Sequence, residues 1–416
     1  MSVDCDVICI GAGPSGAIAS ALLVQAGYSV IVLERQQFPR FSIGESLLPQ
    51  CMAFVEEAGM LEAVQAGNFQ FKNGAAFERG TEHTFFNFEE KFTPGPGTTF
   101  QVQRAAFDKI LADEAQRFGA DIRYGHEILE ADFSEVVNGE VQPRLTAKNP
   151  DGTQREYRCR FVLDASGFGR VLPRLLKLES PSGFPVRQSI FTHVTDHIPE
   201  GSFDRNKILV TVHPEHRDVW YWLIPFSNGR CSLGCVAETE FFAQRDGDNP
   251  AKLKQLVQEA PGLKARLANA EFDTPVQQIV GYSANVSSLH GPGFALLGNA
   301  GEFLDPVFSS GVTIAMKSAS SAVALLKKQF RGEAVDWEND YAIPLKRGVD
   351  TFRDYVEAWY DGKFQDIIFH HDKSTNIKHM ISSVLAGYAW DESNPWVSDS
   401  KRRLRVLSEA CRVENA

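Results

Sequence analysis

The sequence predicts an α/β protein in which a nucleotide-binding βαβ unit is followed by an antiparallel sheet and a C-terminal helical region. Three observations lead to this fold class. A glycine-rich turn separates a short apolar strand from a helix near the N-terminus, residues 184–284 alternate apolar and polar side chains, and the pattern becomes helical and aromatic after about residue 345.

The N-terminal motif has the pattern of a dinucleotide site. Residues 6–10 form an apolar segment that leads into Gly11-Ala-Gly-Pro-Ser-Gly16, and residues 17–26 have a helical pattern. A second apolar strand, 29–33, ends at Glu34, whose carboxylate can accept a hydrogen bond from a ribose hydroxyl. The glycines let the backbone approach a pyrophosphate, and the helix N-terminus supplies N–H donors. The residues expected at the dinucleotide are Gly11, Gly13, Pro14, Ser15, Gly16, Glu34 and Arg35.

The alternating segments between residues 184 and 284 predict a sheet over the nucleotide site. They are rich in β-branched and aromatic residues, as in 208–213 and 219–225. The predicted division has a discontinuous nucleotide-binding domain, a β-sheet substrate domain and a C-terminal helical region. These three parts comprise residues 1–80, 101–180 and 286–345, then 81–100 and 181–285, then 346–416.

Composition narrows the function classes. Hydrophobic residues make up 43% and charged residues 23%, which is ordinary for globular proteins, and a net charge of −11 argues against nucleic acid as the main partner. The seven cysteines are irregularly spaced, so we expect neither a disulfide framework nor a metal site. Free cysteines predict a reducing, cytoplasmic setting. No run approaches the ~20 apolar residues of a membrane span, and the acidic first residues are unlike a signal peptide.

Three further motifs follow the glycine-rich turn along the chain. Arg104 precedes Phe-Asp at 107–108, residues 162–167 are Val-Leu-Asp-Ala-Ser-Gly, and an apolar strand ends at Gly298-Asn299 before a loop and an alanine-rich helix. In this order the motifs resemble the FAD-dependent monooxygenase-like fold of p-hydroxybenzoate hydroxylase, in which Gly-Asp usually stands where this chain has Gly298-Asn299. The resemblance implies bound FAD, in contact with Arg104, Asp164, Gly298, Asn299, Pro306, Gly311 and Val312.

Three segments resemble flavin-dependent halogenases in particular, nearest the pyrrole and phenol types. Residues 219–225, Val-Trp-Tyr-Trp-Leu-Ile-Pro, contain the WxWxIP signature, and residues 303–311 fit the pattern FxxPxxSxG. Residues 69–77 are similar to the stretch that carries the family's essential lysine, here Lys72. This stretch follows a loop, Gly44-Glu45-Ser46, that the resemblance places at the flavin.

The halogenase resemblance implies a reaction as well as a site. Chloride or bromide would be held by the amides of Ser310 and Gly311, and Trp220 and Trp222 would shield the flavin from the organic substrate. FADH2 from a separate flavin reductase and O2 would oxidise the halide to hypohalous acid. Lys72 would then present the halogen to a small electron-rich aromatic substrate, a phenol or pyrrole, either free or tethered to an acyl-carrier protein.

Each of these motifs also has a simpler interpretation. Trp220 and Trp222 share one face of a strand and can simply fill core, and a single lysine such as Lys72 is usually exposed on a strand. The amides at 310–311 can bind the flavin alone. Together with Asn299, these interpretations favour an FAD-dependent dehydrogenase or reductase of the geranylgeranyl reductase-like or aryl-polyene-pathway type. An aromatic hydroxylase and a flavin-binding sensor are further alternatives, and the combined motifs favour the halogenase.

Overall fold

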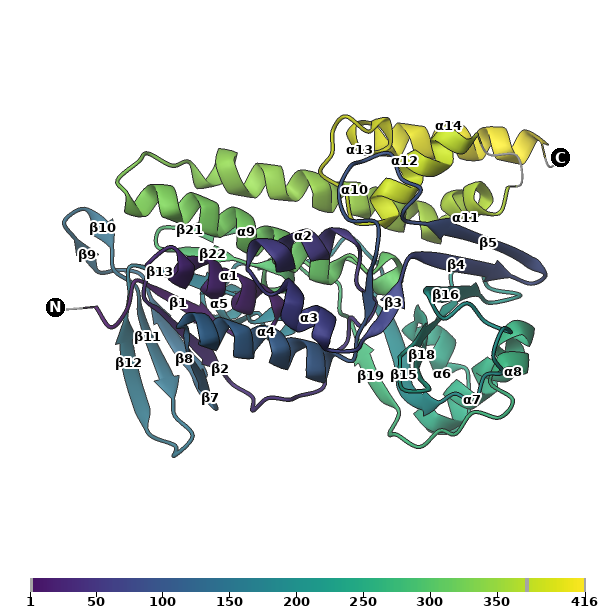
Figure 1. Cartoon of the computed structure of the whole chain (residues 1–416), viewed down its shortest axis with the longest axis horizontal. Helices are drawn as coiled ribbons and strands as arrows, with labels where there is room; N and C mark the ends of the chain where they lie inside the picture. Colours follow the sequence, from purple (N-terminus) through teal and green to yellow (C-terminus); the bar gives the residue numbers. More distant parts are fainter. Residues whose placement is uncertain (1–2, 371–373, 415–416) are drawn as a thin grey trace.

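The computed structural model describes residues 3–370 and 374–414, and two larger sheets with a C-terminal helical layer make up most of it (Figure 1). The first sheet has six strands and is parallel except at β21. In spatial order its strands are β21 (His290–Gly291), β22 (Phe294–Leu296), β13 (Phe161–Asp164), β1 (Val7–Ile10), β2 (Val30–Glu34) and β7 (Asp121–Tyr124). The predicted α/β class with a Rossmann-like domain is confirmed.

Both faces of the six-stranded sheet are covered. Val7 and Cys9 of the central strand face a helical layer, whereas Ile8 and Ile10 face a small antiparallel sheet, because successive strand residues point to opposite sides. The helices are α1 (Pro14–Gln25), α4 (Arg104–Phe118) and α9 (Gly311–Phe330), and the small sheet consists of β8 (Glu127–Asp132), β11 (Arg144–Lys148) and β12 (Gln154–Arg158).

The second sheet has seven strands, which are antiparallel except for the parallel pair β16 and β4. In spatial order they are β19 (Gln277–Val280), β15 (Arg187–Thr195), β18 (Arg230–Glu238), β17 (Trp220–Pro225), β16 (Lys207–Val212), β4 (Gly74–Arg79) and β5 (Glu82–Asn87). Because β4 pairs with β16 and β5, we propose that the first segment of the flavin domain ends near residue 73 instead of residue 80. The other domain boundaries stay predictions.

The two faces of the seven-stranded sheet pack against different helices. Trp220 and Trp222 share a core with the C-terminal helices, and Tyr221, between them, faces the opposite way. Cys231 and Cys235 lie on the same face as Tyr221, as expected for two positions of one strand. The helices against that face are α7 (Asn249–Glu259) and α8 (Pro261–Arg266).

Residues 343–370 and 374–414 are mostly helical, as predicted, and lie along the top of the view in Figure 1. Within the described ranges, none of the helices combines the length and the apolar character needed to cross a membrane. The C-terminal helices are α10 (Ile343–Tyr360), α11 (Lys363–Ile368), α12 (Thr375–Leu385), α13 (Pro395–Ser398) and α14 (Ser400–Glu414).

Trp359 of α10 joins this helical layer to the rest of the molecule. Its side chain is fully buried, and its ring centroid lies 5.9 Å from that of Phe77 on β4. On another side it lies 6.0 Å from the ring of Phe308, in the loop that precedes α9. One indole therefore packs the C-terminal helices against both the large sheet and that loop.

Replacing this indole should destabilise the whole fold. We expect Trp359→Ala to lower the free energy of unfolding by about 3–5 kcal/mol, because the cavity left behind cannot collapse completely. Urea unfolding measures the loss. Val406→Ala on α14, where the side chain is 52% exposed, should stay within about 0.5 kcal/mol of the wild type. Equal losses in the two variants would contradict the anchoring role.

Candidate active site

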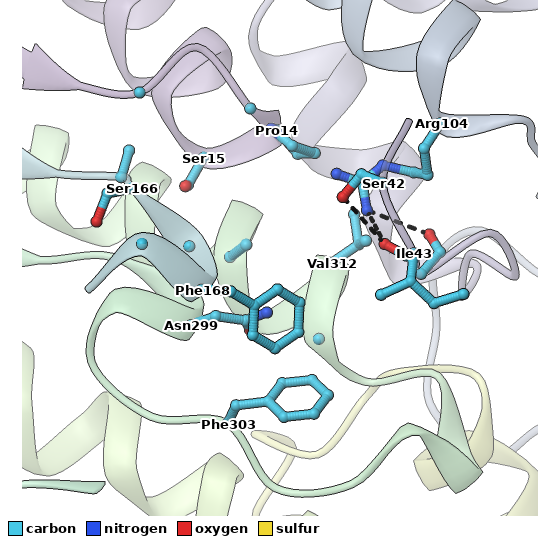
Figure 2. A pocket seen from close by; sticks show the side chains of 18 of the residues that line it. Pro14, Ser15, Ser42, Ile43, Arg104, Ser166, Phe168, Asn299, Phe303 and Val312 are labelled. Carbon is cyan, nitrogen blue, oxygen red and sulfur yellow. Dashed lines mark hydrogen bonds between the residues drawn. The ribbon is translucent and has the colours of Figure 1, made fainter. Parts of the chain in front are cut away.

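A cavity of about 340 Å³ lies between the two larger sheets, and most of the predicted site residues line it (Figure 2). Five predicted residues are not on its lining and lie behind it: Gly16, Lys72, Asp164, Gly298 and Ser310. The predicted residues on the lining are Gly11, Gly13, Pro14, Ser15, Glu34, Arg35, Gly44, Glu45, Ser46, Arg104, Trp220, Trp222, Asn299, Pro306, Gly311 and Val312.

The backbone of the glycine-rich turn can approach a ligand closely because no side chains cover it. At two of its positions a side chain would collide with neighbouring backbone atoms, so only glycine fits. Gly11 has a φ of +97°, and a Cβ there would lie 2.8 Å from the carbonyl oxygen of Ala165. A Cβ on Gly16 would lie 2.0 Å from the carbonyl oxygen of Gly11. Helix α1 begins at Pro14, beside the cavity in Figure 2, and its first N–H groups have no acceptor within the helix. This end of the cavity therefore suits a pyrophosphate.

Glu34 stands at the end of β2 with its carboxylate held by the backbone. The Ala12 amide donates to Oε2 at 2.9 Å and the Gln36 amide donates to Oε1 at 2.8 Å. Each oxygen keeps a second lone pair for a ribose hydroxyl. Arg35 is more exposed and lies 3.9 Å from Glu127, so it contributes a charge at the rim of the cavity.

Arg104 fixes the loop that forms one side of the cavity. Its Nε and Nη2 donate to the two carboxylate oxygens of Asp108 at 2.7 and 2.9 Å, which orients the guanidinium. Its Nη1 then donates to the Ile43 carbonyl at 2.6 Å, as the dashed lines in Figure 2 show. Because the carbonyl of residue 43 is held, the position of Gly44 and of the loop after it is fixed relative to α4.

The opposite side of the cavity is set by the turn after β13. Asp164 accepts hydrogen bonds from the amides of Ser166 and Leu172 at 2.9 and 2.7 Å, although its burial raises the pKa of the carboxyl group. The turn presents Phe168, whose ring centroid lies 5.1 Å from that of Phe303 (Figure 2). Asp164 therefore shapes the site from behind and does not face the cavity.

Asn299 supplies an unused acceptor at the same side. Its Oδ1 is buried and has no hydrogen-bond partner among the described residues. A buried polar atom without a partner is costly, so a ligand hydroxyl that donates to it would be stabilising. Gly298, just before it, has a φ of +53° and lies too close to Ala315 for a side chain. This geometry suits a polyhydroxyl chain such as the ribityl group of FAD.

The loop before α9 ends in a compact turn. Asp305 accepts a hydrogen bond from the Val307 amide at 3.0 Å, and Ser309 adopts a left-handed conformation with φ of 56°. Ser310 is 3% exposed and Gly311 begins the helix on the cavity lining. The first N–H groups of a helix have no acceptor within the helix, so this end favours an anion or a carbonyl oxygen.

The two tryptophans form one wall of the cavity, with ring centroids 6.0 Å apart. The indole N–H of Trp222 donates to Ser232 Oγ at 3.0 Å, and that of Trp220 donates to Tyr360 Oη at 2.9 Å. Tyr360 in turn donates to Asp305 Oδ2 at 2.9 Å. Both indoles are therefore fixed in orientation, and that of Trp220 is coupled to the loop before α9.

Lys72 is the last residue of β3 (Gln70–Lys72), which pairs with β6 (Thr99–Gln101). The lysine is 1% exposed, so the simpler interpretation of an exposed strand residue is wrong. Its Nζ donates to Ser46 Oγ and to the Leu47 carbonyl, both at 2.7 Å. Burial lowers the pKa of the amine to about 7, and a neutral amine has two N–H bonds to match its two acceptors. Ser46 lies between this amine and the cavity.

Sequence patterns did not reveal the pairing of Glu45 with His193. His193 Nε2 lies 2.6 Å from Glu45 Oε1, although the two residues are separated by 148 positions. No local spacing signals such a contact. Phe168 and Phe303 also line the cavity. Phe168 directly follows the motif at 162–167 and Phe303 is the first residue of the motif at 303–311, so their places in the sequence could have identified them.

Comparison with known proteins places this architecture in a family. The sequence model of the FAD binding domain matches residues 4–342. The chain belongs to this family. The glycine-rich turn, Glu34 and the unpaired Asn299 oxygen fit FAD, and the predicted kinship with flavin-dependent halogenases is confirmed by the curated relatives.

Two curated relatives and one solved structure show which kinds of flavoprotein are similar to this chain. A 1H-pyrrole-2-carbonyl-[peptidyl-carrier protein] chlorinase of Pseudomonas fluorescens is 27% identical, over 86% of this chain and 84% of its own length. A flavoprotein/dehydrogenase structure from Cytophaga hutchinsonii is 42% identical with a TM-score of 0.94, and the match covers 99% of this chain and all of that one. A tryptophan 2-halogenase of Chondromyces crocatus is 30% identical, over 79% of this chain and 62% of its own length.

The depressed pKa of Lys72 predicts a specific dependence of stability on pH. Between about pH 7 and 10.5 the unfolded chain carries a proton on residue 72 that the folded chain lacks, so the free energy of unfolding should rise with pH. In Lys72→Met this contribution is absent. Urea unfolding of the flavin-free proteins at pH 7, 8 and 9 should therefore show the wild type gaining stability relative to the variant. A constant difference would show that the amine titrates normally.

Proposed function

We propose that this flavin-dependent oxidoreductase is a halogenase that oxidises chloride or bromide to hypohalous acid and delivers the halogen through Lys72 to an electron-rich aromatic ring. The observation that carries the proposal is the fully buried amine of Lys72, held within hydrogen-bond distance of Ser46 on the lining of the flavin cavity. An amine with a pKa of about 7 is in large part neutral near pH 7, and the neutral form is suited to take up an electrophilic halogen. Kinship with chlorinases and tryptophan halogenases supports the same assignment.

The chain supplies binding, orientation and shielding around the cofactor. FAD, when bound and reduced, supplies two electrons and the capacity to react with O2. The amides of Ser310 and Gly311, at the start of α9, would hold the halide, because a helix N-terminus stabilises an anion. Trp220 and Trp222 fill the wall of the cavity and would keep an organic ring away from the flavin, so that only a small oxidant leaves it.

Lys72 can act in either of two ways. As a neutral amine it can attack hypohalous acid, forming an N–halogen bond with release of water, and then pass the halogen to the ring in exchange for the ring proton. As an ammonium it can donate a hydrogen bond to hypohalous acid and make its halogen more electrophilic. Both roles need a cation or amine at one fixed place, and the hydrogen bonds to Ser46 and Leu47 provide that fixation.

The partners follow from the proposed reaction. A separate flavin reductase would supply FADH2 in the cytoplasm, and the substrate would be a phenol or pyrrole. The chlorinase relative is named for a substrate on a peptidyl-carrier protein, which supports a carrier-tethered substrate here. The exposed basic residues Lys401, Arg402 and Arg403 at the start of α14 are the surface that we propose for an acidic carrier.

One comparison favours a second candidate function. The structure that matches this chain along its whole length at 42% identity is described as a flavoprotein/dehydrogenase. A dehydrogenase would remove hydride from an organic substrate and would need neither halide nor the amine of Lys72. Asn299, where the FAD-dependent monooxygenase-like fold usually has aspartate, is compatible with this alternative.

Removing the amine separates the two functions. With a flavin reductase, FAD, O2 and bromide, the purified wild type should add bromine to members of a panel of free and carrier-tethered phenols and pyrroles, detected as a mass shift. We expect Lys72→Met to lose this product by at least roughly 10²-fold, because it removes the group that carries or activates the halogen. Its FAD affinity, measured by fluorescence, should be unchanged.

The matched control is Lys207→Met. Lys207, the first residue of β16, is also largely buried, but its amine binds Asn73 and Asp204 and does not line the cavity. This variant should brominate like the wild type. Full bromination by Lys72→Met would reject the role of Lys72, and oxidation of a substrate in the absence of halide would favour the dehydrogenase.

A further inference from the structure

A carboxylate and an imidazole form a short contact beside the cavity. Glu45 Oε1 and His193 Nε2 are 2.6 Å apart, and their side chains come from the loop after β2 and from near the C-terminal end of β15. This distance is at the short end of the range for a hydrogen bond. The pair therefore links the flavin-side loop to the large sheet through two groups that both exchange protons.

The two members of the pair face different surroundings. Glu45 is 1% exposed and lines the cavity, and its second oxygen, Oε2, is buried without a hydrogen-bond partner among the described residues. The side chain of His193 is 15% exposed and is not on the cavity lining. The pair thus has one end at the cavity, with a vacant acceptor, and the other at the protein surface.

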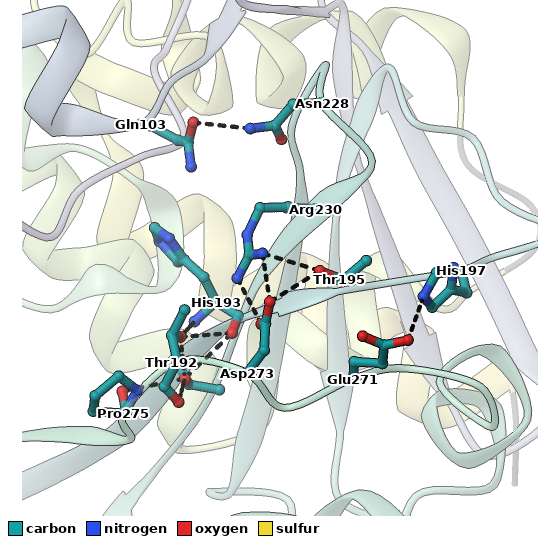
Figure 3. A network of polar contacts seen from close by, with 11 residues as sticks. Gln103, Thr192, His193, Thr195, His197, Asn228, Arg230, Glu271, Asp273 and Pro275 are labelled. Carbon is teal, nitrogen blue, oxygen red and sulfur yellow. Dashed lines mark hydrogen bonds and ion pairs between the residues drawn. The ribbon is translucent and has the colours of Figure 1, made fainter.

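The position of His193 is fixed by its main chain and by aromatic neighbours. Its N–H donates to Thr274 Oγ1 at 3.2 Å, and its carbonyl oxygen accepts from the same hydroxyl at 2.7 Å (Figure 3). The imidazole packs against Phe226 and Phe41, with centroids 5.1 and 5.7 Å away. The ring is therefore held toward Glu45 and has few other polar groups to bind.

We propose that Glu45 and His193 carry protons between solvent and the cavity, an inference that rests on the proposed function. Halide oxidation needs such a path, because FADH2 + O2 + X⁻ + H⁺ gives FAD + HOX + H2O, with two electrons leaving FADH2 and two leaving the halide. One proton is consumed in the cavity for each hypohalous acid formed. Glu45 holds the proton at the cavity, and His193 acts through Glu45 and refills it from solvent.

The first experiment changes the ability to transfer protons while keeping the hydrogen bond. His193→Gln retains an N–H donor for Glu45 but cannot carry a proton. We expect it to slow both the O2-dependent reoxidation of reduced FAD, followed by stopped-flow absorbance with bromide present, and bromination by roughly 10²-fold. His193→Ala should be equally slow and should recover when imidazole is added, because the space of the ring is vacated.

The chain contains a matched control for this pair. His197 Nε2 lies 3.1 Å from Glu271 Oε1 (Figure 3), but both side chains are about half exposed or more and neither lines the cavity. His197→Gln should reoxidise FAD and brominate at wild-type rates. If His193→Gln also keeps both wild-type rates, His193 is only structural and the proton path is rejected.

Measuring both FAD reoxidation and bromination distinguishes a failure of the proposed proton path from a failure of the proposed halogenase function. If the wild type makes no brominated product, the proposed function fails, and the path is judged by FAD reoxidation alone. Slow reoxidation in His193→Gln with imidazole rescue in His193→Ala would then uphold the path, and wild-type reoxidation would overturn it. If the wild type brominates but imidazole restores nothing in His193→Ala, the function stands and the path fails.

A second measurement needs no flavin. In ¹⁵N-histidine-labelled protein without FAD, Glu45→Gln should change the ring nitrogen shifts of His193, because it replaces the carboxylate partner of Nε2 by an amide. The signals of His197 should not move. Unchanged His193 signals would show that the two side chains are not coupled in solution, and the path would be rejected.

Discussion

The buried amine of Lys72 fixes the position of the loop that lines the cavity at the centre of this molecule. Without water around it, the Nζ of Lys72 needs protein acceptors, and it finds them in Ser46 and the Leu47 carbonyl. Both belong to the loop that lines the cavity, so the end of β3 and this loop are held in one relative position. Removal of the amine would leave two buried acceptors without their donor, which makes the contact a structural as well as a chemical requirement.

The same loop is the point where the other parts of the site meet. Arg104 fixes its start through the carbonyl of residue 43, Lys72 fixes residues 46 and 47, and His193 of the large sheet reaches Glu45 between them. On the far side of the cavity, Tyr360 of the C-terminal helices connects Trp220 to Asp305. The C-terminal layer thus positions the tryptophan wall, although none of its described residues lies on the cavity lining.

The features of the site that could be predicted from the sequence are those formed by residues close together in the chain. The glycine-rich turn, Glu34 at the end of a strand and the two tryptophans two positions apart were found because fixed local geometry places them. The pairings of His193 with Glu45 and of Tyr360 with Asp305 span 148 and 55 positions, and only the tertiary fold determines them. For the same reason, the pairing of β4 with β16, on which our proposed boundary near residue 73 rests, has no local signal.

The buried amine of Lys72 beside the flavin cavity loses its proton at a much lower pH than an ordinary lysine, and lysine-selective NMR measures this titration. The ¹³Cε signal of Lys72, assigned by comparison with Lys72→Met, should titrate with a pKa of about 7 in the flavin-free protein. That result would show that the amine from which we propose the halogen is delivered is in large part uncharged near pH 7. Titration at the ordinary lysine value near 10.5 would contradict the account, because the group would then be a solvated ammonium at neutral pH.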